Sequence, residues 1–419
     1  MKLILEPAPL FGVWKAIPSK SVLHRALICA AVADGKTGIL CARSSEDIDA
    51  TADCLRAMGA GVEWTESGFV VTPIGTVGKA MLFCRESGST LRFLLPLAAA
   101  LGCEATFFAD EGLQKRPLAP LKEALSSHGV CLSEGFPLQV AGKLQPGRFA
   151  LPGTVSSQFI SGLLLALPLL EEESEIEVAG ELASAPYIEI TLKTLSRFGV
   201  EIERRDNTFF VHPAGFQSPG RVEIEGDWSN GAFALAAGLL CGSVTVAGLK
   251  KDSPQGDAAC VKVFASMGGK IAETNTGFAA EKSDLHGITF DASQNPDLVP
   301  VIAALAAVAG GKTVITGAGR LRYKESDRLQ TVCGLINGLG GDCEVSDDGL
   351  IIRGKPVLRG GAVDACGDHR IAMCAAVLAG RCISPVVLTG AECVSKSDPL
   401  FFEDFGKVGA KLCFLSETT

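Results

Sequence analysis

Long apolar segments recur six times along the chain, and each is followed by a turn and a short β-rich segment. In the run from Phe233 to Leu240, apolar residues cover every side of the predicted helix rather than a single stripe. Helices of that kind are buried all round. With turn and strand included, the six segments are Leu27–Ile39, Leu94–Phe107, Leu163–Ile176, Phe233–Val246, Ile302–Ile315 and Ile371–Val387.

A second signal repeats with the same period of about 70 residues. It is a more polar helix that ends in glycine, the residue preferred where the chain turns left-handed after a helix. The strand that follows alternates with period two, as in Val200-Glu201-Ile202-Glu203. The six glycines are Gly59, Gly129, Gly199, Gly268, Gly340 and Gly409.

Two independent signals with one period predict six units of the form strand–helix–strand–helix–strand–strand. A chain of 419 residues is too long for one hydrophobic core, so we expect two α/β domains of three units each. The period exceeds that of the common solenoids. The repeat alone divides the chain once, near residue 211.

Composition and charge narrow the functional classes. The chain is 47% hydrophobic, as in an ordinary globular protein. Its net charge of −9 argues against general nucleic-acid binding, which favours a basic domain. The richest apolar stretch, 159–170, is too short to cross a bilayer, and no signal peptide is evident. Most of the fifteen cysteines sit in apolar segments without a C-x-x-C pair. We therefore expect reduced, buried thiols in a cytoplasmic protein, with no metal site.

Candidate chemistry gathers where the predicted buried helices begin. Lys20 opens the first of them, beside Ser19 and Ser21, either of which could simply cap the helix. A lysine at the positive end of a helix is unfavourable. An anion bound between Lys20 and the free N–H groups would reverse that penalty, so we favour an anion site over a cap.

The second and third buried helices start in short polar side chains. Ser87-Gly88-Ser89-Thr90 lets a phosphate approach the backbone closely, although the same run is also an ordinary loop. Ser156-Ser157-Gln158 suits either a cap or a polyol or phosphate partner. Both alternatives stay open for these two runs.

The C-terminal half repeats the arrangement with charged residues. The run 324–328 reads Lys-Glu-Ser-Asp-Arg and opens one helix, where capping and solvated charge would be the simpler interpretation. Asp368-His369-Arg370 leads directly into a helix that should be buried. Three polar side chains at the start of a buried helix indicate a functional site rather than an ordinary solvent-exposed surface.

Together these runs resemble the enolpyruvyl transferases of the 3-phosphoshikimate 1-carboxyvinyltransferase (EPSP synthase) family. They occur in family order over nearly the whole chain, and their combination is specific although each alone is weak. The matching runs are Ser19-Lys20-Ser21 with Arg25, Ser87-Gly88-Ser89-Thr90-Leu91-Arg92, Arg116-Pro117-Leu118, Ser156-Ser157-Gln158, Pro186-Tyr187, Glu225-Gly226-Asp227, Asn295-Pro296-Asp297, Lys324-Glu325-Ser326-Asp327-Arg328, Asp368-His369-Arg370 and Lys396.

The resemblance implies a two-domain inside-out α/β barrel of six βαβαββ repeats. One domain would comprise 1–15 with 226–419 and the other 16–225, separated by a cleft. The chain would cross a double hinge near 15–18 and 225–227. The resemblance also implies a monomer that binds neither nucleic acid nor membrane.

The implied substrates are phosphoenolpyruvate and shikimate 3-phosphate. Phosphoenolpyruvate would be held by Lys20, Gly88, Arg116, Gln158, Arg328, Arg370 and Lys396. Shikimate 3-phosphate would be held by Lys20, Ser21, Arg25, Ser156, Ser157, Gln158, Ser184, Tyr187, Asp297 and Lys324. A phosphate and a carboxylate on a three-carbon frame need several cations, and guanidinium groups match both.

The implied reaction is addition followed by elimination, without metal or organic cofactor. The catalytic residues would be Asp297, Glu325 and Lys20, with the two carboxylates dividing proton removal and delivery. Glyphosate would occupy the phosphoenolpyruvate site. Two residues depart from the family pattern: Arg320, where a short polar residue is expected, and Glu86, where Asn is usual, which we expect to pair with Arg85 or Arg92.

Three other functions fit the sequence less well. A UDP-N-acetylglucosamine enolpyruvyl transferase shares fold and donor, but usually has Asn after the first lysine and a cysteine shortly before the Arg-Pro step. Here Ser21 follows Lys20, and 110–116 contains no cysteine. A non-catalytic binding protein would have no need for Asp297 with Glu325. RNA 3′-phosphate cyclases use related units but fit an acidic chain poorly.

Overall fold

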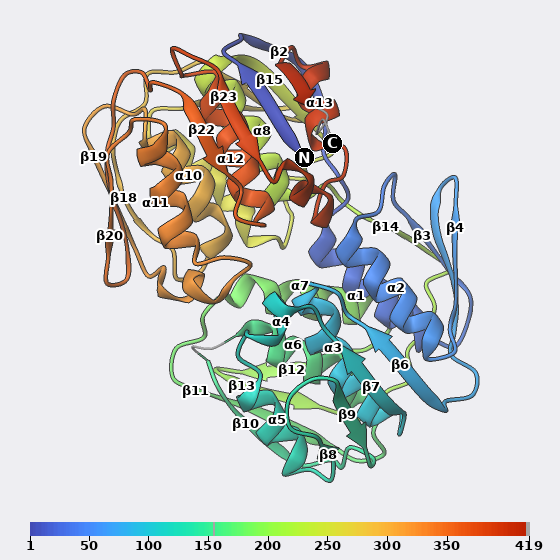
Figure 1. The fold of residues 1–419 in the computed structure, drawn as a ribbon. Coiled ribbons are helices and arrows are strands. Elements are labelled where there is room, and N and C mark those ends of the chain that lie inside the picture. The colour runs from blue at the N-terminus through green and yellow to red at the C-terminus, as the bar shows by residue number, and fades with distance from the viewer. Residues whose placement is uncertain (154–155, 416–419) are drawn as a thin grey trace. The chain divides into compact units, whose positions relative to one another are not determined.

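The computed structural model describes residues 1–153 and 156–415 (Figure 1). The chain divides into two compact units. We call Pro18–Ile224 the N-terminal unit and Met1–Ile17 with Glu225–Thr419 the C-terminal unit.

The N-terminal unit contains three four-stranded sheets with the orders β14-β3-β5-β4, β6-β7-β9-β8 and β10-β11-β13-β12. In each, the first two strands are parallel and the other neighbours antiparallel; Val222 of β14, for example, pairs with Ile39 of β3. The strands are β3 (Thr37–Leu40), β4 (Gly61–Thr65), β5 (Gly68–Thr72), β6 (Lys79–Phe83), β7 (Glu104–Phe108), β8 (Cys131–Leu132), β9 (Leu138–Ala141), β10 (Arg148–Pro152), β11 (Ser174–Ala179), β12 (Glu203–Arg205), β13 (Thr208–Val211) and β14 (Arg221–Glu223).

Three buried helices form the core of this unit, and the others lie nearer solvent. The buried helices are α1 (Lys20–Ala31), α3 (Gly88–Ala100) and α6 (Ser157–Ala166), and every residue of α1 from Val22 onward is buried. Helix α7 instead buries Ile188 and Ile190 while exposing Lys193, as its more polar sequence predicts. The outer helices are α2 (Glu46–Ala57), α4 (Glu111–Gln114), α5 (Ala119–Ser126) and α7 (Ala185–Arg197), with a 3-10 turn η1 (Leu167–Leu169).

The C-terminal unit repeats the plan with sheets β16-β17-β15-β2, β18-β19-β21-β20 and β22-β23-β1-β24. Its strands are β1 (Lys2–Glu6), β2 (Leu10–Lys15), β15 (Gly242–Ala247), β16 (Lys270–Thr274), β17 (Gly277–Glu281), β18 (Thr289–Asp291), β19 (Lys312–Thr316), β20 (Cys343–Ser346), β21 (Gly349–Arg353), β22 (Gly361–Asp364), β23 (Val386–Thr389) and β24 (Lys411–Leu415). Its buried helices are α8 (Trp228–Cys241), α10 (Val299–Ala306) and α12 (His369–Ala379). The remaining helices are α9 (Cys260–Ser266), α11 (Arg328–Gly338) and α13 (Phe401–Lys407), with 3-10 turns η2 (Gly256–Ala259), η3 (Pro296–Leu298), η4 (Gly319–Tyr323) and η5 (Ala391–Lys396).

The N-terminal segment supplies two strands to this unit. β2 pairs in parallel with β15, and β1 lies between β23 and β24, with Ile4 opposite Cys413. In Figure 1 the blue N-terminal strands accordingly lie among red C-terminal elements. The repeat alone does not reveal this, because β1 and β2 are separated along the chain from the sheets that they complete.

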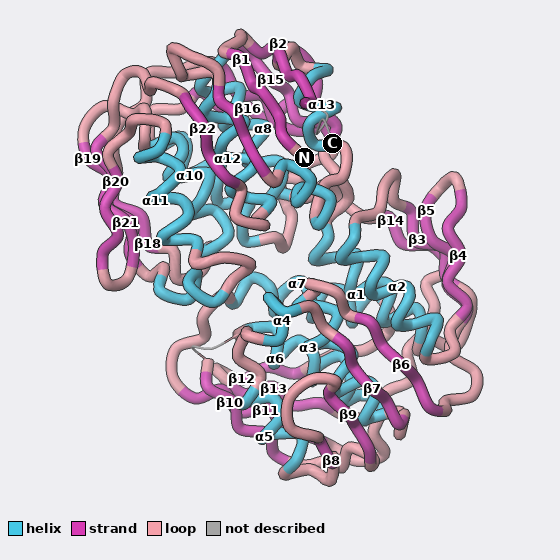
Figure 2. Tube along the Cα trace, in the orientation of Figure 1, coloured by secondary structure: helices cyan, strands magenta, loops and turns pink. Residues whose placement is uncertain are grey.

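The structure confirms the repeat. Each unit contains three four-stranded sheets and three buried helices, and in Figure 2 the magenta strands lie toward the outside of each unit. All six glycines of the second signal have positive φ, from 76° at Gly199 to 104° at Gly409. An L side chain is disfavoured in that conformation, so glycine is needed at the end of each second helix.

Two further expectations concern membrane-spanning helices and the state of the cysteines. No helix among them is long and apolar enough to span a bilayer. The fifteen cysteines all lie within the described residues as free thiols, and most are buried.

Candidate functional site

In the N-terminal unit, Lys20 is the first residue of α1 and has an acidic partner. Its Nζ lies 2.7 Å from Oδ2 of Asp47, which comes from the first turn of α2. The lysine side chain is 22% exposed and Asp47 is 9% exposed. Asp47 therefore compensates a cation at the positive end of a helix. The sequence did not point to this partner, because Asp47 lies in a run of acidic residues typical of any helix start.

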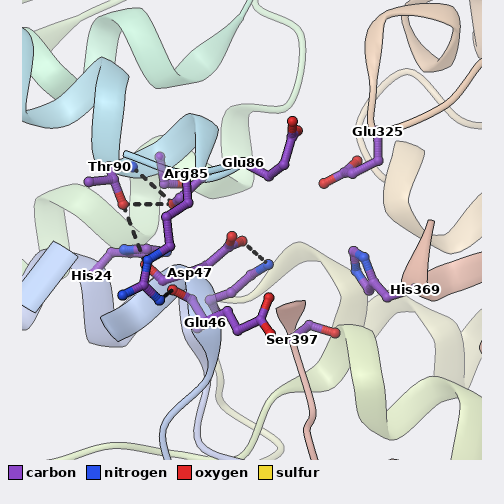
Figure 3. Close-up of polar contacts among 12 residues, drawn as sticks. His24, Glu46, Asp47, Arg85, Glu86, Thr90, Glu325, His369 and Ser397 are labelled. Atoms are coloured by element: carbon purple, nitrogen blue, oxygen red, sulfur yellow. Dashed lines mark hydrogen bonds and ion pairs between the residues drawn. The ribbon is translucent and has the colours of Figure 1, made fainter. Parts of the chain in front are cut away.

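Hydrogen bonds between buried polar side chains join the N-terminal halves of α1, α2 and α3 (Figure 3). The Nδ1 of His24 lies 2.7 Å from Oγ1 of Thr51, and that oxygen lies 2.6 Å from Oγ1 of Thr90. Thr90 donates in turn to Oγ of Ser87, 2.7 Å away, while Ser87 caps α3 by accepting from the Thr90 N–H. Helices α1, α2 and α3 are thereby fixed relative to one another at their polar ends.

Arg25 lies under this surface rather than on it, with 2% of its area exposed. Four of its five N–H groups donate to protein acceptors: Oγ1 of Thr191, the carbonyl of Ser21, Oγ of Ser161 and the carbonyl of Tyr187. Burial lowers the pKa of Arg25 to about 9. Its described contacts hold Ser21 and Tyr187 in place, and direct contact with substrate remains a prediction.

Two guanidinium groups converge on Gly88, the first residue of α3. A β-carbon at Gly88 would lie 3.3 Å from Nη1 of Arg92 and 3.5 Å from Nη1 of Arg116. Arg92 donates to Oε1 of Gln158 over 2.6 Å, and Nε2 of Gln158 donates to Ser89 over 2.9 Å. The start of α3 is therefore cationic and, lacking a side chain at Gly88, open to close approach.

The remaining predicted residues of this unit also lie at helix starts. Ser156 caps α6 by accepting from the Gln158 N–H, and Ser157 is the first residue of that helix. Ser184 precedes α7 in a left-handed conformation, with φ 56°, and is buried. Tyr187 lies in the first turn of α7. Thr154 and Val155, which precede Ser156 in the sequence, lie outside the described residues.

In the C-terminal unit, one buried guanidinium holds three carboxylates. Nε of Arg328 lies 2.8 Å from Oδ2 of Asp368, Nη1 lies 2.9 Å from Oδ1 of Asp297, and Nη2 lies 2.8 Å from Oε2 of Glu325. The arginine is 2% exposed. Burial opposes its charge, but the three carboxylates outweigh burial and raise the pKa of Arg328. This group is therefore a permanent cation.

Asp297 is shared among the cations of the same cluster. Besides Arg328, its side chain lies 3.3 Å from Nζ of Lys324 and 3.5 Å from Nη2 of Arg370, whose Nη1 also donates to the Asp297 carbonyl. Burial lowers the pKa of Lys324, and the neighbouring Asp297 opposes that shift. A lysine poised in this way can donate a proton more readily than an exposed one.

The starts of α11 and α12 explain why these groups meet. Asp368 caps α12 by accepting from the Arg370 N–H, and Ser326 donates to the same carboxylate over 3.0 Å. Burial raises the pKa of Asp368, but the charge of Arg328 outweighs that effect, so the pKa of this carboxyl lies below its ordinary value. Lys396 ends η5 and is buried. The structure thus brings Asp297, Lys324, Glu325, Arg328 and Arg370 into one cluster of contacts.

Comparisons with known proteins give the family. A family model described as EPSP synthase (3-phosphoshikimate 1-carboxyvinyltransferase) matches residues 5–405. The chain belongs to the EPSP synthase family. The 3-phosphoshikimate 1-carboxyvinyltransferase of Clostridium kluyveri is 43% identical over 415 residues, which is 97% of each chain, and that of Clostridium novyi is 40% identical.

Solved structures agree with the EPSP synthase assignment. An EPSP synthase from Acinetobacter baumannii superposes with a TM-score of 0.83 at 25% identity, covering 99% of this chain and 100% of that one. The enolpyruvyl transferase NikO from Streptomyces tendae has a TM-score of 0.79 at 18% identity, a likeness that concerns the fold alone.

Two residues that depart from the EPSP synthase pattern are accounted for by their contacts. Nη2 of Arg320 donates to the Ser293 carbonyl over 2.6 Å. The described ion pair of Glu86 is with Arg116, at 3.3 Å, whereas Arg85 pairs with Asp53. Neither Arg116 nor Asp53 was an expected partner, because both are distant in sequence.

Sequence reasoning also missed Asp257, a buried carboxylate beside the cluster. It is 3% exposed, accepts a hydrogen bond from Ser229 at the start of α8, and has no partner for Oδ1 among the described residues. Burial and the nearby charge of Asp297 raise the pKa of Asp257 to about 6. One signal could have found it: Asp257 stands three repeats after Asp47, and both residues open the second helical segment of their repeat.

Proposed function

We propose that the polar helix starts of the two units bind the two anionic substrates of one reaction. The chain transfers the enolpyruvyl group of phosphoenolpyruvate to the 5-hydroxyl of shikimate 3-phosphate and releases phosphate. The observation that carries the assignment of roles is the pair Asp297 and Glu325 on one guanidinium, Arg328. Two carboxylates tied to permanent cations can hold and pass protons beside bound anions.

We assign phosphoenolpyruvate to the cationic side chains that the fold buries and holds in place. Guanidinium groups that are buried and fixed cost little entropy when they bind phosphate or carboxylate. Arg328 is of this kind, and Gly88 gives access to Arg92 and Arg116. The proposed set is Lys20, Gly88, Arg116, Gln158, Arg328, Arg370 and Lys396.

Shikimate 3-phosphate is assigned to the hydroxyl-rich helix starts. Serine hydroxyls and helix N–H groups suit a phosphate, and Asp297 with Lys324 suits the 5-hydroxyl that reacts. Arg25 supports this set through its bonds to Ser21 and Tyr187. The proposed set is Lys20, Ser21, Arg25, Ser156, Ser157, Gln158, Ser184, Tyr187, Asp297 and Lys324.

Proton transfers accompany both halves of the reaction. The 5-hydroxyl loses its proton as its oxygen bonds to C2 of phosphoenolpyruvate, and C3 gains a proton to become a methyl group. In the second half the C2–O bond to phosphate breaks while C3 returns a proton, which restores the double bond. Asp297 and Glu325 are the proposed acid and base, Lys20 is the third proposed catalytic residue, and fixed cations stabilise the departing phosphate.

The acceptor can be tested directly. Phosphate release should require shikimate 3-phosphate, and UDP-N-acetylglucosamine should give none, since the family comparison does not favour that alternative. Turnover with the nucleotide sugar and not with shikimate 3-phosphate would refute the proposed acceptor. We further propose that the protein acts as a cytoplasmic monomer.

Gly88→Ala should weaken inhibition by glyphosate more than it weakens use of phosphoenolpyruvate. The added methyl group would stand 3.3 Å from Nη1 of Arg92 and 3.5 Å from Nη1 of Arg116, inside the proposed anion site. We expect about a tenfold rise in the glyphosate inhibition constant, on the order of 1.4 kcal/mol, with a smaller rise in the KM of phosphoenolpyruvate. Inhibition assays at several phosphoenolpyruvate concentrations measure both. Equal weakening of the two ligands would contradict the prediction.

Shikimate 3-phosphate should make the protein more compact in solution. We propose that the two units are domains joined by a double hinge near 15–18 and 225–227, with a cleft that closes on this substrate. Cations on both proposed faces repel when no anion is bound, and an acceptor with phosphate and carboxylate can bridge them. Small-angle scattering should show a smaller radius of gyration with shikimate 3-phosphate than with phosphoenolpyruvate alone. An unchanged radius at saturation would rule out closure by the acceptor.

A further inference from the structure

Glu86 stands at the turn into α3 with its carboxylate directed to the segment that contains Arg116. Oε1 accepts from the backbone N–H of Leu113 and Oε2 from Nη2 of Arg116, both over 3.3 Å. The preceding residue, Arg85, has φ 51°, a left-handed conformation that is uncommon outside glycine. The Arg85 side chain forms an exposed ion pair with Asp53 of α2, 2.8 Å away. Glu86 thus follows a turn of unusual backbone conformation, and its two contacts set the direction of its carboxylate.

This carboxylate helps to orient Arg116. Its side chain is 8% exposed, so the guanidinium has little water to satisfy its donors. One edge, at Nη2, meets Glu86, and this leaves Nη1 facing Gly88. Leu113, whose N–H binds the other oxygen, is anchored in the core at 1% exposure. Glu86 thus ties the guanidinium to a fixed point of the fold.

A carboxylate makes both contacts with separate oxygens. Its two oxygens accept from two separate donors, whereas a glutamine has a single acceptor oxygen and would turn an NH₂ group toward one of them. The residue on the other side of the carboxylate is Gly112, and a β-carbon there would lie 2.8 Å from Oε1 and 2.9 Å from Oε2. The Glu86 carboxylate can occupy this position because Gly112 has no side chain.

We propose that Glu86 is a positioning residue that turns Nη1 of Arg116 toward phosphoenolpyruvate. This proposal rests on the proposed role of Arg116 as a ligand of that substrate. Glu86 contacts no substrate in this scheme and acts only through Arg116. Its loss affects phosphoenolpyruvate and leaves shikimate 3-phosphate and the chemical step nearly unchanged.

The first test separates the two substrates kinetically. Glu86→Ala should raise the KM of phosphoenolpyruvate by about tenfold, within the range that misplacement of a binding group produces. The KM of shikimate 3-phosphate and kcat should stay within about twofold. Glu86→Gln should give an intermediate rise, since it keeps one of two acceptors. An equal rise in both KM values would indicate a general structural role and overturn the proposal.

The second test displaces the carboxylate without removing it. Gly112→Ala should raise the KM of phosphoenolpyruvate much as Glu86→Ala does, because the new methyl group would push the carboxylate away. The double variant should be little worse than either single one, as expected when both changes break the same contact. Fully additive effects would show that Gly112 and Glu86 act separately, against the proposal.

Two controls make the outcomes distinct. Glu111→Gln removes one exposed negative charge from the same segment and should leave every constant unchanged, which excludes a general charge effect. Arg116→Ala should raise the KM of phosphoenolpyruvate at least as much as Glu86→Ala. If Arg116→Ala does so and Glu86→Ala does not, only the inference about Glu86 fails. If Arg116→Ala has no effect, the proposed binding site itself is wrong and the role of Glu86 falls with it.

Discussion

Asp297→Ala and Glu325→Ala should each lower kcat by about a hundredfold or more, the usual scale for loss of a general acid or base. Both carboxylates lie on the guanidinium of Arg328 and are 13% exposed, so they are accessible yet held in place. Steady-state assays at saturating concentrations of both substrates measure the effect. Asp297→Asn and Glu325→Gln, which keep volume and remove charge, should lose similar activity.

The structure supplies a matched control for this experiment. Asp284 is an exposed carboxylate of the same unit, and Asp284→Asn should leave kcat unchanged. Circular dichroism should show that the catalytic variants remain folded, because Arg328 keeps two of its three carboxylate partners in each. Near-normal kcat in both alanine variants would refute their assignment as acid and base.

Asp368→Ala should destabilise the protein by about 2–4 kcal/mol, because a buried donor left without its acceptor costs about 1–3 kcal/mol and a lost helix cap about 1 kcal/mol. Asp368 is fully buried and binds Nε and Nη2 of Arg328, which is itself 2% exposed. The variant also loses the cap of α12. Urea unfolding should show a lower midpoint.

The same ion pair fixes the sign of a pH effect. The pKa of Asp368 is lower in the folded protein than in the unfolded chain, so its contribution is present above the ordinary carboxyl pKa of about 4. That contribution is lost as pH falls through the folded pKa. Asp368→Ala should therefore lose its stability difference from the wild type in strong acid. An unfolding midpoint equal to the wild type at neutral pH would contradict the assignment.

Periodicity allowed much of the fold to be predicted. The apolar helices and the glycines after the second helices are local signals, because burial and a left-handed φ each demand a residue type at one position. Gly199 and Gly409 could thus be placed without tertiary information. The pairing of β1 with β24 could not, since strand partners at opposite ends of a chain leave no periodic trace.

The residues of the candidate site likewise fall into those that local sequence rules indicate and those that only the fold brings together. Lys20, Arg328 and Asp368 stand out because charge at a buried helix start breaks a local rule. Their partners do not stand out, because Asp47 resembles any acidic residue in a first helical turn. Glu86 with Arg116 is a contact across 30 residues that only the fold creates. Arg25 donates to four protein acceptors that no sequence pattern could indicate.

The exchange of strands between chain ends has a consequence for biosynthesis. The N-terminal unit has all its strands once β14 has left the ribosome, so it can fold while the chain is still growing. The C-terminal unit cannot do so, because β1 is made first and its neighbour β24 last. Closing a loop of almost the whole chain costs entropy that only completed contacts repay. Until β24 has been made, β1 lacks one of its two neighbours, whereas β2 can pair as soon as β15 has left the ribosome.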